Sequence, residues 1–152
     1  MKRSTSITCL VILGVLVLAA CASRSDGEAE GGGPRVTVLI YSGRPNPTFS
    51  LTAEQAERVR QLVAAAQPDS AFRGESVLPS ILGYNGLLIE GLPASLAVYG
   101  GKVEVQESEG GKRFLSDGGA LEDFLLETAT QNRALDAEQL RFIQSSRDRP
   151  QS

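Results

Sequence analysis

Histidine is absent from this 152-residue sequence, and its two cysteines, Cys9 and Cys21, both lie near the N-terminus. Without histidine there is no Ser–His–Asp or Cys–His catalytic arrangement, and the usual nitrogen ligands of zinc are missing. Carboxylates are the groups left for general acid and base chemistry, and glycosidases need only two of them, about 5–10 Å apart. We therefore predict no metal and no other cofactor, and hydrolysis would have to depend on Asp and Glu.

Glu90, Glu104 and Glu107 are the carboxylates of the predicted sheet that could form such a pair. Apolar and polar residues alternate over 103–106, which predicts that Glu104 points outward from a half-exposed strand. No EF-hand spacing is present, so calcium is not indicated. A solvated sheet face is the preferred interpretation of these carboxylates.

The loop Ser42–Pro47 combines one cation and one amide with two prolines. Pro45 and Pro47 fix φ at alternate positions, and Asn46 is held extended by the proline that follows it. A stiff loop of this kind would present Arg44 and Asn46 to a ligand. It would equally suit a structural corner, in which Arg44 donates to backbone carbonyls or pairs with a carboxylate such as Glu90.

Another segment, Gly83-Tyr84-Asn85-Gly86, has a glycine at each end and adds Tyr84 and Asn85 to the candidate binding residues. Glu90, on the strand that follows, is a further candidate. Tyr84 could instead cover the core without contacting a ligand. The candidate binding residues are therefore Arg44, Asn46, Tyr84, Asn85 and Glu90.

The elements that would position these residues follow from periodicity and turn signals. Apolar runs and Gly-Gly turns predict strands within 36–41, 87–90, 96–99, 103–106 and 112–115. Capping signals at Thr52, Asp117 and Asp136 predict three helices, the second with a buried stripe of Leu121, Phe124, Leu125 and Thr128. This order predicts an α+β domain at 35–146, with a mostly antiparallel sheet of four or five strands and two or three helices on one face.

The N-terminus resembles a bacterial lipoprotein signal. Lys2 and Arg3 precede a twelve-residue apolar run, Ile7 to Leu18, and Leu18-Ala19-Ala20-Cys21 follows the lipoprotein cleavage pattern. The apolar run is shorter than the ~20 residues of a spanning helix. The resemblance implies a signal peptide at 1–20 and a lipid on Cys21, and Ala22 implies the outer membrane where two membranes exist.

Small, polar and acidic residues follow Cys21, so 21–34 is predicted to be a flexible tether and 147–152 a disordered tail. Loss of Lys2 and Arg3 with the signal would change the formal charge from −3 to −5. With no basic block, nucleic acid is not an expected partner. The expected partners are the membrane, through the lipid on Cys21, and an envelope protein or a small ligand.

The domain also resembles a family of small proteins marked by the motif Ser-Gly-Arg-Pro-Asn-Pro, which stands here at 42–47. The similarity extends to Leu82-Gly83-Tyr84, Gly86 and 114–117, and spans roughly Val36 to Ala129. Phe49 and Asn85 stand where that family has Trp and Arg. The resemblance implies a common fold and no particular reaction. The sequence thus predicts a non-enzymatic, lipid-anchored binding module, with a carboxylate-dependent hydrolase of envelope glycan as the alternative.

Overall fold

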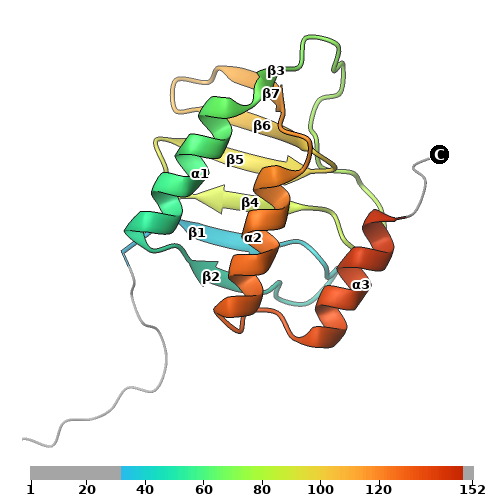
Figure 1. Ribbon diagram of the computed structural model, residues 1–152. Coiled ribbons are helices and arrows are strands. Elements are labelled where there is room, and N and C mark those ends of the chain that lie inside the picture. Colours follow the sequence, from blue (N-terminus) through green and yellow to red (C-terminus); the bar gives the residue numbers. More distant parts are fainter. Residues whose placement is uncertain (1–31, 149–152) are drawn as a thin grey trace, which may run out of the picture.

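A computed structural model describes residues 32–148, which form one antiparallel sheet covered by three helices (Figure 1). The signal peptide, Cys21 and the tether up to residue 31 lie outside the described residues, as do residues 149–152. The elements in chain order are β1 (Arg35–Val38), β2 (Thr48–Ser50), α1 (Ala53–Ala65), β3 (Gln67–Pro68), β4 (Leu87–Glu90), β5 (Ala94–Tyr99), β6 (Lys102–Glu107), β7 (Lys112–Ser116), α2 (Ala120–Gln131) and α3 (Ala137–Arg147).

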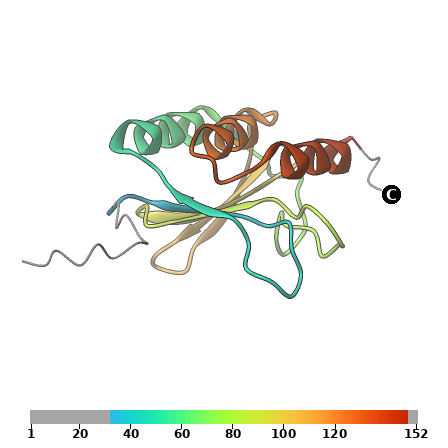
Figure 2. The ribbon, with the colours of Figure 1, turned by 90° about the horizontal axis from the view of Figure 1, so that it is seen from below.

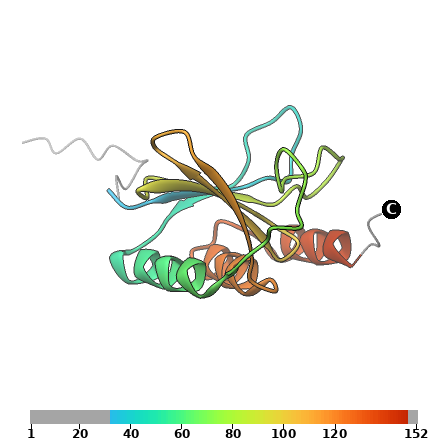
Figure 3. The same ribbon diagram turned by 90° about the horizontal axis from the view of Figure 1, so that it is seen from above.

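The sheet has seven strands in the order β2-β1-β4-β5-β6-β7-β3, and every neighbouring pair is antiparallel. One row of paired residues, Val36, Ile89, Leu96 and Val105, is buried against the helices. Figures 2 and 3 show all three helices on this one face of the sheet. The predicted α+β class, the antiparallel sheet and the placement of the helices are confirmed.

Capping boxes fix the starts of two helices at the predicted residues. The Thr52 side chain accepts from the Gln55 backbone N–H, and the Gln55 side chain accepts from the Thr52 N–H in return. Asp136 and Gln139 repeat this exchange at the start of α3. Each exchange satisfies backbone donors that the first helical turn leaves free.

The prediction of four or five strands is too low, because it omits both edge strands. β2 and β3 contain three and two residues, and Pro68 occupies half of β3. Such short segments show no alternation, and their pairing with β1 and β7 depends on tertiary structure. The five interior strands, β1, β4, β5, β6 and β7, occur in the predicted order along the chain.

The buried stripe of α2 is rotated from its predicted position. Glu122, Leu126 and Ala129 are buried beside Leu121, Leu125 and Thr128, whereas Phe124 is only half-buried. A helix packed between a sheet and a neighbouring helix buries a wider face than its apolar residues alone indicate. Glu122 is a charged residue within that buried face, which the apolar pattern does not predict.

The second sheet face is covered in part by residues 69–86, so Glu104 is not the solvated side chain that alternation predicts. Glu104 is 8% exposed and accepts from the Val77 backbone N–H at 3.1 Å. Its other oxygen pairs with Lys112 at 2.7 Å. Phe72 from the same loop packs on Phe114 of β7, with 4.6 Å between ring centroids. The carboxylate thus holds the loop onto the sheet.

Acid is expected to loosen this loop. Burial raises the pKa of Glu104, but hydrogen bonds from Lys112, Ser76 and Val77 outweigh it and leave the pKa below its ordinary value of 4.5. A lowered folded-state pKa means that the stabilisation is present above about pH 4.5 and is lost as the pH falls through the folded value. Hydrogen exchange at the Val77 amide should therefore accelerate on acidification, after correction for intrinsic rates.

In Glu104→Ala, exchange at Val77 should be fast at every pH, whereas Glu109→Ala, in the exposed turn after β6, should leave it unchanged. Equal protection in Glu104→Ala and the unchanged protein would show that the carboxylate does not hold the loop.

Candidate functional site

The two ends of the sheet carry different parts of the chain. The described chain enters β1 at one end, where Leu51 donates its N–H to the Pro34 carbonyl. The loop 39–47, the loop 81–86, the β5–β6 turn and α3 gather at the other end, which we call the loop end (Figure 1). All of the predicted binding residues except Glu90 lie at the loop end. Glu90 is exposed and lies opposite Arg35 at the entry end.

A buried carboxylate, Glu122, links three elements at the loop end. Its side chain is fully buried and accepts from the Tyr84 hydroxyl at 2.7 Å and from the Gly100 backbone N–H at 3.0 Å. Arg147 of α3 lies 3.6 Å from the same carboxylate and donates to Asp123 at 2.7 Å. The network therefore connects the loop 81–86, the β5–β6 turn, α2 and α3.

Burial and electrostatics set the protonation states in this network. Burial, with the charge of Glu122, raises the pKa of Tyr84 far above its ordinary value. For Arg147, burial acts to lower the pKa, but the Asp123 hydrogen bond and the charge of Glu122 outweigh it and leave the pKa raised. Tyr84 is therefore a neutral donor and Arg147 a permanent cation.

These contacts correct two predictions. Tyr84 is 1% exposed, so it is not a surface binding residue, and the interpretation that it covers the core is the right one. The predicted tail begins at residue 147, but Arg147 is the last residue of α3 and donates to Asp123. The ordered domain thus extends beyond residue 146.

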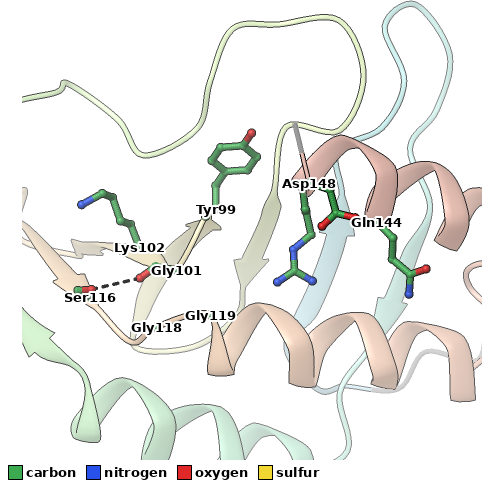
Figure 4. Close-up of a pocket in the computed structure, with 10 residues that line it drawn as sticks. Tyr99, Gly101, Lys102, Ser116, Gly118, Gly119, Gln144 and Asp148 are labelled. Atoms are coloured by element: carbon green, nitrogen blue, oxygen red, sulfur yellow. Dashed lines mark hydrogen bonds between the residues drawn. The ribbon is translucent and has the colours of Figure 1, made fainter. Parts of the chain in front are cut away.

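A polar hollow of about 680 Å³ adjoins this network, because Gly100 and Arg147 also line the hollow. Figure 4 shows the lining residues. The walls of the hollow come from the β5–β6 turn, the β7–α2 connection and the last turn of α3, with Tyr99, Lys102, Ser116, Gln144 and Asp148 among the lining side chains. Gly101 and Gly119 approach closely there, since a Cβ on Gly101 would be 3.1 Å from the Gly119 nitrogen. Gly101 also has φ of +74°, so glycine is required at this position.

The cations of the polar hollow are already paired. Lys102 binds Asp69, and Arg147 binds Asp123 and Glu122. The backbone N–H groups of Gly119 and Leu121, at the start of α2, donate to the Asp117 carboxylate. An anionic ligand would have to displace one of these carboxylates. Lys102 and Arg147 are therefore not free to bind an anion in the hollow.

Asn46 and Asn85 have structural roles in their loops. Asn46 Oδ1 accepts from the backbone N–H groups of Ile40 and Tyr41 at 3.0 and 2.8 Å. The Asn85 side chain donates to the carbonyls of Ile81 and Gly83 at 2.9 Å each. Both amides are thus occupied by backbone groups, and they fix the shape of the surface rather than recognise a ligand.

Arg44 is exposed, and its guanidinium lies over the Tyr41 ring, 3.4 Å from the centroid. Tyr41 is itself fixed, because its hydroxyl accepts from Gln139 Nε2 at 2.7 Å. Arg44 therefore forms no ion pair with Glu90, which lies at the entry end of the sheet. Of the two interpretations of the loop, the structure shows an exposed, oriented Arg44.

Exposed apolar side chains lie at the same end of the sheet as Arg44. Across residues 32–148 the exposed large hydrophobic residues are Ile81, Leu82 and Phe142, at 54%, 87% and 41% exposure. A Cβ on Gly83 would be 3.4 Å from the Phe142 ring, so the loop 81–86 lies against α3. Phe142, Tyr41 and Arg44 line one hollow of about 470 Å³. We call this set, Tyr41, Arg44, Ile81, Leu82 and Phe142, the Arg44 surface.

The candidate carboxylates Glu104 and Glu107 have different partners. Glu104 is bound by Lys112 and Val77, and Glu107 pairs with Arg113 at 3.1 Å. Glu90 takes part in neither of these ion pairs. Within residues 32–148 no group of three or more Asp, Glu, His or Cys side chains could hold a metal ion. None of the helices in that range is long and apolar enough to cross a membrane.

Sequence reasoning missed Glu122, Arg147, Leu82 and Phe142. Glu122 follows Leu121 in the first turn of α2, where a carboxylate is expected from the helix dipole alone. Only the pairing of α2 with the loop 81–86 distinguishes it from exposed Asp123 beside it. The pair Ile81-Leu82, two large apolar residues in a loop rich in Pro, Gly and Ser, was the available signal for the Arg44 surface.

Comparisons with protein-family models, curated proteins and solved structures find no match to this chain. The fold class therefore rests on the structure itself.

Proposed function

We propose that this chain is a lipid-anchored protein of the cell envelope, whose domain binds a partner protein through the Arg44 surface without catalysing a reaction. The observation that carries the proposal is that exposed Phe142 lines one hollow with an exposed, oriented Arg44, while the exposed pair Ile81-Leu82 precedes Gly83, which lies against Phe142. Isolated exposed apolar residues are ordinary, but a contiguous group with polar residues around it is typical of an interaction site.

The composition of the Arg44 surface supports a protein as its partner. Tyr and Arg are enriched among the residues that dominate binding energy, and they act from positions already held in place. Tyr41 is held by Gln139, and Arg44 lies on the Tyr41 ring. Asp136 and Glu138 lie in the same hollow, so a partner would meet an apolar centre within a charged margin.

The position of the Arg44 surface also suits a tethered domain. The chain enters at the opposite end of the sheet, so a lipid on Cys21 would leave the loop end directed away from its own anchor (Figure 1). A tether of thirteen residues, from Ala22 to Pro34, would let the domain reach on the order of 20 Å from the lipid by the random-coil estimate. The Arg44 surface would then face other envelope proteins.

Crosslinking from one position tests this proposal. A photoreactive amino acid at Leu82 of the full-length protein, activated in intact cells, should give a discrete adduct with a partner. Arg44→Ala should weaken binding by about 2 kcal/mol, or roughly thirtyfold, and reduce the adduct accordingly. Because Arg44 is exposed, the same change should cost no more than about 1 kcal/mol of stability, the scale of its contact with the Tyr41 ring.

The same photoreactive residue at Arg58, which is exposed on α1, should give no such adduct and serves as the matched control. Equal adducts from both positions, or an adduct indifferent to Arg44→Ala, would count against the Arg44 surface. A large loss of stability in Arg44→Ala would show that this residue holds the fold instead.

A further inference from the structure

An apolar groove lies on the helix face, at the edge of α1 that the other helices leave uncovered. Val59, Val63 and Ala64 form its α1 wall, and Leu96, Val105 and Leu115 form its floor on β5, β6 and β7. The groove encloses about 390 Å³. At the ~30 Å³ that a water-sized group takes up in a liquid, this is room for about a dozen methylene groups.

The charges at the margin of the groove are neutralised within the protein. Arg113 pairs with Glu107 at 3.1 Å, and Arg60 pairs with Glu57 at 2.8 Å. No free charge is therefore directed into the groove from these residues. A chain of methylene groups without a polar end is the chemistry that such a lining accommodates.

The groove adjoins the place where the chain enters the domain. Pro34 lies against Gly91, since a Cβ on Gly91 would be 3.3 Å from the Pro34 Cα. The next two residues, Leu92 and Pro93, line the groove. Figure 1 shows β1 beginning on the same side of the sheet as the β4–β5 turn. Whatever is attached to the chain shortly before residue 32 is thus held near the groove.

Cys21 is close enough in sequence for its lipid to reach this groove. Ten residues separate Cys21 from Gly32, the first described residue. Ten residues of flexible chain span roughly 17 Å on average, and up to about 33 Å when extended. We propose that the groove holds one acyl chain of the lipid on Cys21 of the same molecule, an inference that rests on the lipid anchoring proposed above. The held chain would keep the entry end of the domain close to Cys21.

A photoreactive lipid tests the inference. Full-length protein is produced in bacterial cells fed a palmitate analogue with a diazirine near the chain end, and it is illuminated in dilute detergent. The expected product is an intramolecular crosslink from Cys21 to peptides that contain Val63 or Leu92. Ala64→Trp, which places a bulky ring in the groove, should reduce this product several-fold.

Ala65→Trp is the matched control, because Ala65 is exposed on the next position of α1 and does not line the groove. This variant should crosslink as the unchanged protein does. Acylated Cys21 without the intramolecular product, equal products in both tryptophan variants, or labelling of a second copy would each overturn the inference. Absence of the analogue from Cys21 would instead contradict the lipid anchoring on which the inference rests, and the mass of the N-terminal peptide distinguishes the two failures.

Discussion

Replacement of Glu122 by alanine is expected to lower the free energy of unfolding by about 3–5 kcal/mol, the cost of breaking a buried ion pair by removal of one partner. The Tyr84 hydroxyl and the Gly100 N–H would both lose their acceptor, and Arg147 would lose one of its two carboxylates. Urea unfolding at neutral pH measures the change. A loss of this size is a large share of the 5–15 kcal/mol that holds an ordinary domain together.

Two comparisons make the Glu122 result specific. Glu127→Ala removes an exposed carboxylate from the same helix and should change stability by no more than about 0.5 kcal/mol. Tyr84→Phe removes one donor while it keeps the ring, and should cost less than Glu122→Ala, about 1–3 kcal/mol. If Glu122→Ala unfolds within 1 kcal/mol of the unchanged protein, roughly the effect of an ordinary surface change, the network does not stabilise the loop end.

Cys21→Ala is expected to abolish lipid attachment and, with it, cleavage of the signal peptide. In the lipoprotein class that the N-terminus resembles, lipid attachment precedes cleavage, so the variant should accumulate as a precursor that still carries residues 1–20. Stable anchoring takes about two acyl chains, each methylene contributing roughly 0.8 kcal/mol, so the cleaved protein would depend on the lipid for its attachment. Detergent phase partition and the mass of the N-terminal peptide measure the outcome.

Cys9→Ala provides the control within the same segment, because Cys9 lies in the apolar run that the signal peptidase would remove. This variant should be cleaved and anchored as before. A Cys21→Ala protein that is still cut at the bond before residue 21 and remains membrane-bound would contradict the lipoprotein interpretation.

Local signals predicted the helices and interior strands because those signals act within a few residues. The capping boxes at Thr52 and Asp136 are three-residue exchanges, and both occur as predicted. The edge strands β2 and β3 were missed because three and two residues carry no periodicity. β3 pairs with β7, which lies distant in sequence, and β2 pairs with β1 across the proline-framed loop.

The candidate site was predicted only in part, for a related reason. The proline-framed loop left two interpretations of Arg44 open, display to a ligand or a structural contact with backbone carbonyls or a carboxylate such as Glu90, and the structure shows Arg44 exposed over the Tyr41 ring. The roles of Tyr84 and Glu122 depend on a contact across 38 residues of sequence, which no local pattern encodes. Phe142 joins the Arg44 surface from α3 for the same reason, because only the packing of α3 on the loop 81–86 brings it there.

The short edge strands limit pairing between copies of the domain that are crowded on one membrane. A lipid would concentrate many copies of this domain on one membrane, where an open sheet edge would invite pairing between copies and fibrous aggregation. β2 presents only three residues and follows two closely spaced prolines, and β3 presents two residues, one of them Pro68, which cannot donate to a ladder. Neither edge can readily accept an added strand. A partner would therefore be recognised by side chains at the loop end rather than by extension of the sheet.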